Sequence, residues 1–201
     1  MLAGLCDVRL AQKVHMKFHP HTARCQWQSP LGRITLSASP LGLSGVFFED
    51  QRHLPDLQAW PEDERNPFMQ AGIALLQAYF NGQASALDAP LAIPLDLQGG
   101  TAFQQSVWQA LLRIPAGQTQ SYGHLAQQVS RPAAVRAVGA AVGRNPISLI
   151  VPCHRIVGAS GQLTGYAGGL WRKEALLQGE HALPATIAAR ASPSATLPLF
   201  E

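Results

Sequence analysis

The hydrophobic pattern of the chain changes at the glycine pair Gly99-Gly100, and this change limits the fold more than any other feature of the sequence. Before the pair, RITLSAS (33–39) alternates apolar and polar residues as a half-buried strand does, and GLSGVFFED (42–50) predicts a second strand after a short turn. A helical spacing follows in residues 67–83, and LAIPLDL (91–97) predicts one more short strand. The first half of the chain therefore predicts a small unit of strands and a helix.

Helical spacing predominates after the glycine pair. Thr101 can cap a helix that begins at residue 102, and Ser121 can cap a second helix that begins at residue 122. A tight turn joins this second helix to AAVRAVGAAVGRN (133–145), and two short helices joined in this way are typical of a helix-turn-helix. SLIVPC (148–153) predicts a short strand, and RKEALLQGE (172–180) predicts the closing helix.

These patterns predict an α+β protein in four parts. We expect an N-terminal extension over residues 1–24, an α/β domain over 25–99, a mostly helical domain over 100–181, and a disordered tail over 182–201 that is rich in Ala, Pro, Ser and Thr. The chain shows no apolar run long enough to cross a bilayer, and charged residues interrupt its N-terminus where a secretory signal would be apolar. We therefore expect a cytoplasmic protein whose three cysteines are free thiols.

Basic residues are concentrated in the second half of the chain. Between Thr101 and His181 there are seven basic residues and two acidic ones, whereas the remainder has eight basic and ten acidic residues. This distribution favours a polyanionic partner such as a nucleic acid.

The segment NPISLIVPCHRIV (145–157) carries the most chemistry in the sequence. Cys153 follows an apolar run and a proline, and cationic or imidazole groups such as those of His154 and Arg155 favour the reactive thiolate. Two other interpretations are a buried core cysteine, which is the commoner fate of a lone cysteine, and a metal ligand. Cys6, Cys25 and Cys153 are too scattered to predict a metal site.

The segment IVPCHRIV, followed by GYAGGLWRKEALL, resembles the O6-alkylguanine-DNA alkyltransferase family, the methylated-DNA–protein-cysteine methyltransferases. The resemblance is close over residues 101–180 and loose over the N-terminal part. It implies a ribonuclease-H-like α/β domain followed by a helical domain with a helix-turn-helix. It also implies stoichiometric transfer of an alkyl group from O6-alkylguanine, and from O4-alkylthymine, in double-stranded DNA to the protein, with no cofactor.

The resemblance assigns a catalytic role to five residues. Cys153 matches the alkyl acceptor, His154 matches a base that acts on the thiol through a water molecule, and Glu174 matches the carboxylate that orients this histidine. Tyr122 matches a hydroxyl that donates toward the purine, and Asn145 matches a residue that ties the helix-turn-helix to the active-site loop.

The resemblance also implies a DNA-binding helix and a base pocket. Arg136 matches a side chain that enters the base stack when the damaged base is flipped out, and its helix sits in the minor groove. The residues expected at the DNA are Ser121, Tyr122, Ala134, Val135, Arg136, Ala137 and Gly139. The residues expected to line the pocket are Ser148, Pro152, Arg155, Ile156, Tyr166 and Ala167. Ser148 stands where some members have a proline that narrows the pocket, so we expect alkyl groups larger than methyl to be accepted.

Two further features lie near the ends of the chain. His15, His19, His21 and Cys25 cluster in the sequence, but their spacing fits no zinc site of the family, so we expect no metal. Leu197, Leu199 and Phe200, near the C-terminus, resemble a peptide that docks on the sliding clamp, although an apolar tail packing on its own domain fits equally well.

Three other functions fit parts of the sequence. A lesion-binding protein of the same fold would lack the acceptor Cys153, and a cysteine hydrolase would need a histidine distant in sequence. A helix-turn-helix regulator would read the major groove with polar side chains, whereas AAVRAVGAA offers almost none.

Overall fold

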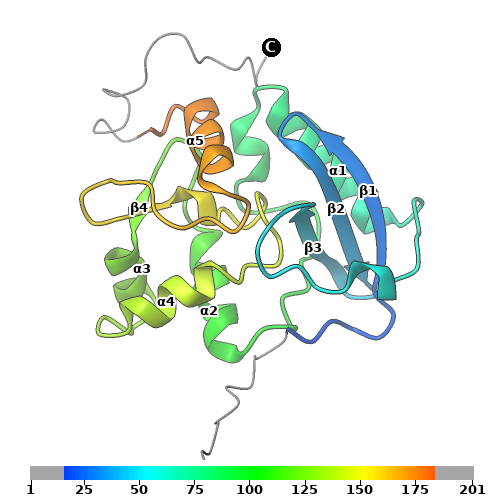
Figure 1. Cartoon of the computed structure of the whole chain (residues 1–201), viewed down its shortest axis with the longest axis horizontal. Helices are drawn as coiled ribbons and strands as arrows, with labels where there is room; N and C mark the ends of the chain where they lie inside the picture. The colour runs from blue at the N-terminus through cyan, green and yellow to red at the C-terminus, as the bar shows by residue number, and fades with distance from the viewer. Residues whose placement is uncertain (1–15, 184–201) are drawn as a thin grey trace, which may run out of the picture.

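The computed structural model describes residues 16–183, in which a small sheet and its helix lie beside a cluster of four helices (Figure 1). The sheet is antiparallel and consists of β1 (Ala23–Ser29), β2 (Gly32–Ser39) and β3 (Gly42–Phe48) in that order. Helix α1 (Pro67–Phe80) covers one face of the sheet, and a Cβ on its Gly72 would lie 3.1 Å from the Leu36 side chain. Two 3-10 turns, η1 (Leu57–Ala59) and η2 (Ala84–Leu87), flank α1 in the chain.

The second half of the chain forms the helix cluster. It contains α2 (Ala102–Leu111), α3 (Tyr122–Gln128), α4 (Val135–Val142) and α5 (Leu170–Gly179). A two-residue strand before α3, β4 (Gln120–Ser121), pairs in parallel with β5 (Ile156–Val157), and the 3-10 turn η3 (Cys153–Arg155) leads directly into β5. The helices therefore hold the cysteine segment between them.

Local capping explains where most of these helices begin. Asn66 accepts hydrogen bonds from the first turn of α1, where Pro67 occupies a position that needs no N–H donor. Thr101 and Gln104 form a reciprocal capping box at α2. Ser121 accepts a hydrogen bond of 3.1 Å from the backbone N–H of His124 and so starts α3. The predicted start points of these three helices are confirmed.

Close packing explains the glycine pair that divides the two patterns. A Cβ on Gly100 would lie only 2.3 Å from the Trp108 ring, so this position must be glycine for the ring to pack there. The buried Trp108 ring donates from Nε1 to the carbonyl of Ala141 at 2.9 Å, which joins α2 to α4.

Two segments predicted as strands are irregular in the structure. In residues 91–97, Leu95 forms an isolated β-bridge with Leu43 of β3, and the rest of the segment consists of bends and extended chain. Residues 148–152 form turns, and Leu149 adopts the left-handed conformation with a φ of 71°. An apolar run reads the same in sequence whether it is a strand or a buried turn, so periodicity could not distinguish the two.

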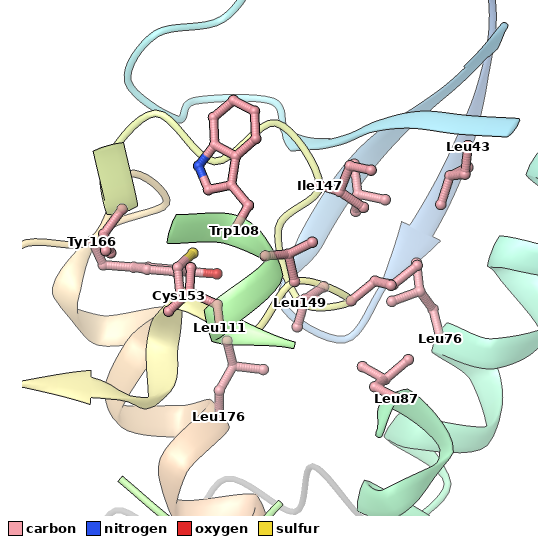
Figure 2. Close-up of a cluster of buried hydrophobic side chains, with 14 of the residues drawn as sticks. Leu43, Leu76, Leu87, Trp108, Leu111, Ile147, Leu149, Cys153, Tyr166 and Leu176 are labelled. Carbon is pink, nitrogen blue, oxygen red and sulfur yellow. The ribbon is translucent and has the colours of Figure 1, made fainter. Parts of the chain in front are cut away.

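One hydrophobic core joins the two halves of the chain, here called the N-terminal half (residues 16–99) and the C-terminal half (100–183). Figure 2 shows Leu43, Leu76 and Leu87 from the first half meeting residues of the second, and all of them belong to one buried cluster. The members of that cluster from the second half that Figure 2 labels are Trp108, Leu111, Ile147, Leu149, Cys153, Tyr166 and Leu176.

Backbone hydrogen bonds also cross between the halves, and they end on the cysteine segment. Val46 of β3 donates to the carbonyl of Pro146 at 2.9 Å and accepts from the backbone N–H of Ser148 at 3.1 Å. The N–H of Arg52 donates to the carbonyl of Ala167 at 2.9 Å. Strand β3 therefore supports loop 145–153, and the turn that follows β3 supports loop 165–169. None of the helices within residues 16–183 has the length and apolar character needed to cross a membrane.

The side chain of Arg172 also links the N-terminal half to the C-terminal half. It is buried and donates to the carbonyls of Leu31 at 2.9 Å and Gly168 at 2.8 Å, and to a carboxylate oxygen of Asp50 at 2.6 Å. Its guanidinium lies 4.4 Å from the centre of the Phe48 ring, within the range of a cation–π contact.

We expect Arg172→Ala to lower the free energy of unfolding by roughly 3–5 kcal/mol, because two buried carbonyls lose their donor and the Phe48 contact is lost. Asp50→Asn is the matched control. The Asp50 side chain is 60% exposed, so its ion pair should contribute under about 1 kcal/mol. Urea unfolding of both variants measures the difference, and equal losses would contradict this account of the interface.

Candidate active site

Asn145 organises the turn that carries the cysteine. It follows α4, is buried, and donates from Nδ2 to the carbonyl of Val151 at 2.8 Å and to Sγ of Cys153 at 3.1 Å. Its Oδ1 accepts from the backbone N–H of Ile147 at 3.0 Å. One amide thus closes the loop at both ends, which explains why residues 148–152 turn rather than extend. Asn145 lies where the resemblance placed it, between the helix-turn-helix and Cys153.

The Cys153 thiol lies in a nearly closed environment, with only 4% of the residue exposed. Burial raises the pKa of Cys153, while the Asn145 amide and the positive charge of Lys173 act in the opposite direction. At neutral pH the resting group is therefore the thiol, and a base is needed to produce the nucleophilic thiolate.

His154 is paired with Glu180, which corrects the prediction for Glu174. Nε2 of His154 lies 2.9 Å from Oε1 of Glu180, and both side chains are fully buried. Glu174 is exposed on the outer side of α5. The buried positions of this segment include 173, 176, 177 and 180, which recur at helical spacing, and residue 174 falls outside that stripe. This spacing was the signal in the sequence that pointed to Glu180.

The other nitrogen of His154 remains available for chemistry. Nδ1 is buried and has no hydrogen-bond partner among residues 16–183. Burial lowers the pKa of His154, and the neighbouring Arg155 and Lys173 act in the same direction, whereas Glu180 opposes them. The imidazole is therefore neutral at rest and can accept a proton.

Arg155 has a structural position rather than the predicted place in the substrate pocket. Its fully buried guanidinium donates to both carboxylate oxygens of Glu180 at 2.9 Å, to Asp88 at 2.9 Å and to the carbonyl of Ile114 at 2.6 Å. These bonds occupy the side chain inside the protein. Although burial opposes ionisation of Glu180, His154 and Arg155 together lower the pKa of that carboxyl to about 2.

Lys173 is a buried site residue that the sequence analysis did not single out. Its Nζ donates to the carbonyls of Ile156 and Thr164, on the two chain segments that follow the cysteine. Burial lowers the pKa of Lys173 to about 8, and the nearby Cys153 favours its charged form. Its position on the buried stripe of α5 was the available signal, because a lysine is almost never fully buried without a partner.

Tyr122, the first residue of α3, lies between α4 and the glycine-rich loop, which is residues 165–169. A Cβ on Gly139 would lie 3.7 Å from the Tyr122 ring, and a Cβ on Gly165 would lie 3.8 Å from its hydroxyl. Tyr122 is half-buried, and burial raises its pKa, so the phenol keeps its proton. The ring therefore connects the helix-turn-helix to the segment that contains Tyr166.

The exposed side of helix α4 carries two alanines beside a valine and an arginine. Val135, Arg136, Ala137 and Ala140 are exposed, while Val138, Ala141 and Val142 face the core. Of the other residues predicted to contact DNA, Ala134 stands at the N-cap of α4, and Ser121 caps α3 next to Tyr122. The structure thus brings the predicted DNA-binding residues onto α4 and the start of α3.

Three of the six predicted pocket residues lie next to the cysteine. Pro152 and Ile156 are buried on either side of η3, and Tyr166 lies beside Cys153 in the buried cluster (Figure 2). The Tyr166 hydroxyl is buried and has no hydrogen-bond partner within the described part of the chain. Ser148 is buried with its Oγ 3.4 Å from Oε1 of Gln51, and Ala167 is half-buried.

Two of the predictions concern residues that the structure covers in part or not at all. His19, His21 and Cys25 are described, and within residues 16–183 no three His, Cys, Asp or Glu side chains gather where they could hold a metal ion. His15 lies outside the described residues, as do Cys6 and the predicted clamp-binding residues Leu197, Leu199 and Phe200.

Comparison with known families gives the class of the protein. Residues 26–93 match the ribonuclease-like domain of 6-O-methylguanine DNA methyltransferase, and residues 102–182 match the DNA-binding domain of the same protein. The chain therefore belongs to the 6-O-methylguanine DNA methyltransferase family. The resemblance drawn from the two motifs and the predicted fold class are confirmed.

Individual relatives are similar over most of their length. The chain is 48% identical over 150 residues to a methylated-DNA–protein-cysteine methyltransferase of Mycolicibacterium paratuberculosis, which covers 74% of this chain and 86% of that protein. It is 44% identical over 153 residues to one of Methanosarcina acetivorans, which covers 76% and 94%. A crystal structure of Mycobacterium tuberculosis OGT in complex with DNA matches with a TM-score of 0.72 at 42% identity, covering 90% of this chain and 99% of that one.

We expect Glu180→Gln to lower the free energy of unfolding at pH 7 by roughly 3 kcal/mol, because Arg155 and His154 lose their charged partner. The folded pKa of Glu180, about 2, lies below its ordinary value of 4.5. The stabilisation is therefore complete above pH 4.5 and is lost as the pH falls through 2.

Urea unfolding between pH 7 and pH 2 measures this effect. The gap between wild type and Glu180→Gln should narrow toward the acid end. Glu174→Gln, six residues away on the exposed side of α5, is the matched control and should leave stability unchanged at every pH. A gap that stays constant down to pH 2 would contradict the assignment.

Proposed function

We propose that this protein repairs DNA by moving the alkyl group of an O6-alkylguanine in duplex DNA onto Sγ of its own Cys153. The observation that carries the proposal is the buried arrangement in which Asn145 holds the thiol while the adjacent His154 is paired with Glu180. A nucleophile, a base and an orienting carboxylate in this order are the parts of an activated thiol. Family membership and the DNA complex of the Mycobacterium tuberculosis relative support a DNA partner.

The reaction begins with a proton transfer. The Cys153 thiol gives its proton to Nδ1 of His154 through a water molecule, and Glu180 stabilises the imidazolium that forms. This route is supported by the geometry of His154, because Nε2 is occupied by Glu180 and Nδ1 is the nitrogen with no partner among residues 16–183. The charged form of Lys173 favours the thiolate.

The thiolate then attacks the alkyl carbon. A bond forms between sulfur and carbon, the bond between carbon and O6 breaks, and its electron pair stays on the guanine, which takes one proton to become neutral. The Tyr122 phenol is suited to donate toward the purine, since it keeps its proton and lies beside the glycine-rich loop. The thioether has no thiol left to react, so each chain acts once. O4-alkylthymine is a second expected substrate because its alkyl group is bound to oxygen in the same way.

The damaged base must leave the helix before it reaches Cys153, because the thiol is buried in the protein. The exposed small residues of α4 suit a helix that lies in the minor groove, with Arg136 able to fill the space that the base leaves. The unpartnered hydroxyl of Tyr166 beside Cys153 supports a polar ligand at that point.

Intact-protein mass spectrometry tests the transfer. After mixing with a duplex that contains one O6-methylguanine, we expect wild type to gain the mass of one methylene group, saturating at one per chain. Cys153→Ala should gain nothing. If wild type binds the duplex but its mass is unchanged, the protein binds lesions without repairing them, and repeated turnover would instead indicate a hydrolase.

The size of the pocket is tested with O6-benzylguanine. Ser148 is a small buried residue at the position that narrows the pocket when it is proline, so we expect wild type to react with the benzyl compound and Ser148→Pro to react at least about tenfold more slowly. Methyl transfer from duplex DNA by both proteins is the control. Failure of wild type to react with the benzyl compound, while methyl transfer proceeds, would reject this view of the pocket.

A further inference from the structure

The carboxylate that faces His154 is already neutralised by another partner. Arg155 donates from Nε to Oε2 of Glu180 and from a terminal nitrogen to Oε1, both at 2.9 Å. A paired arginine and glutamate carry no net charge together. Such a pair alone stabilises a buried imidazolium weakly, because the attraction of the carboxylate is opposed by the guanidinium beside it.

A second carboxylate lies on the other side of the same arginine. Asp88, which follows η2 in the N-terminal half, accepts from Arg155 at 2.9 Å. Its two oxygens also accept from the backbone N–H of Ala116 at 3.0 and 3.2 Å, which holds the carboxylate toward the guanidinium. The Asp88 side chain is 23% exposed and that of Arg155 is fully buried. The result is a row of four groups: Asp88, Arg155, Glu180 and His154.

The charges in this row balance only when His154 is protonated. With a neutral imidazole, two carboxylates face one guanidinium and the row has a net charge of −1. When His154 accepts the thiol proton, the row becomes neutral. Without Asp88 the same step would take a neutral row to a net charge of +1 in a buried place, which is unfavourable.

We propose that Asp88 is a positioning residue of the transfer reaction, which supplies the negative charge that allows His154 to accept the proton of Cys153. It acts through Arg155 and Glu180 and touches neither the thiol nor the base. The proposal rests on the function proposed above, because it presupposes that His154 is the base. It also gives the N-terminal half a part in the chemistry.

Lys173 and the tyrosines near His154 and Cys153 are positive or neutral, so they do not supply this negative charge. Lys173 on α5 lies near both Cys153 and His154, and its positive charge favours the thiolate but opposes the imidazolium. Tyr79 on α1 donates its hydroxyl to Oε1 of Glu180 at 3.0 Å and is neutral, since burial raises its pKa. Tyr122 and Tyr166 near the thiol are neutral for the same reason. Without Asp88, the positive charges of Arg155 and Lys173 near His154 would exceed the negative charge of Glu180. Asp88 adds a second negative charge there.

The test is the pH profile of the single-turnover rate constant, measured at saturating DNA. Asp88→Asn keeps an oxygen that can accept from Arg155 and removes the charge. We expect the rate constant to fall about tenfold on the plateau, because His154 becomes a weaker base. The base must be neutral to accept a proton, so a lower pKa of His154 moves the acid limb of the profile to lower pH.

Two further variants separate charge from structure. Asp88→Glu keeps the negative charge and should return the acid limb toward that of wild type. Asp50→Asn removes a different carboxylate that pairs across the two halves, with Arg172, and should leave the limb in place. An NMR titration of the His154 ring gives the same comparison without DNA.

The outcomes distinguish this proposal from the function on which it rests. If wild type transfers no alkyl group to Cys153, the proposed function fails. If wild type reacts but Asp88→Asn keeps the rate of wild type, or loses rate with its acid limb unmoved, then Asp88 has at most a structural role and this inference is overturned. The inference is supported if the acid limb of Asp88→Asn is shifted and that of Asp88→Glu returns to the position of wild type. If Asp88→Asn does not fold, the pH profile of Asp88→Glu decides, and a profile unlike that of wild type overturns the inference.

Discussion

The rest of the site depends on the hydrogen bonds that the buried carboxylate of Glu180 accepts. It accepts hydrogen bonds from His154, Arg155 and Tyr79, and these donors come from the cysteine turn and from the helix that backs the sheet. A buried charge of this kind is stable only when donors surround it, so its presence fixes the positions of all three. His154 is therefore held by the same contacts that hold α1 against the C-terminal half.

The motif residues could be predicted from the sequence because they are contiguous. Asn145, Cys153 and His154 lie within a stretch of ten residues, and the structure places them around one turn. The N-caps Thr101 and Ser121 were equally readable, since a cap depends on residues three positions apart. The ribonuclease-like part was predicted less fully. Segment 91–97 has the apolar pattern of a strand, but in the structure it pairs with the sheet only through the bridge between Leu43 and Leu95.

The partners of the motif could not be predicted in the same way. Glu174 lies in the middle of α5 and Glu180 follows its last residue, and a local resemblance does not say which of the two turns inward. The decision depends on the face that α5 buries, and therefore on packing against residues far away in the chain. The same holds for Arg155, whose partner Asp88 is 67 positions earlier, and for Lys173, which bonds to two loop carbonyls. Helical spacing can indicate which side of α5 is buried, but it does not identify the distant group that each buried charge meets.

The crossing hydrogen bonds between β3 and the cysteine turn have a consequence for how such proteins can evolve. Val46 forms hydrogen bonds with Pro146 and Ser148, and the carboxylate of Asp88 accepts one from Arg155. Each half therefore presents groups whose positions match those of the other half. A gene assembled by recombination at the glycine pair, with its two parts taken from distant relatives, would inherit an intact motif and a mismatched boundary. The two parts are therefore expected to be inherited together, as a single unit of selection.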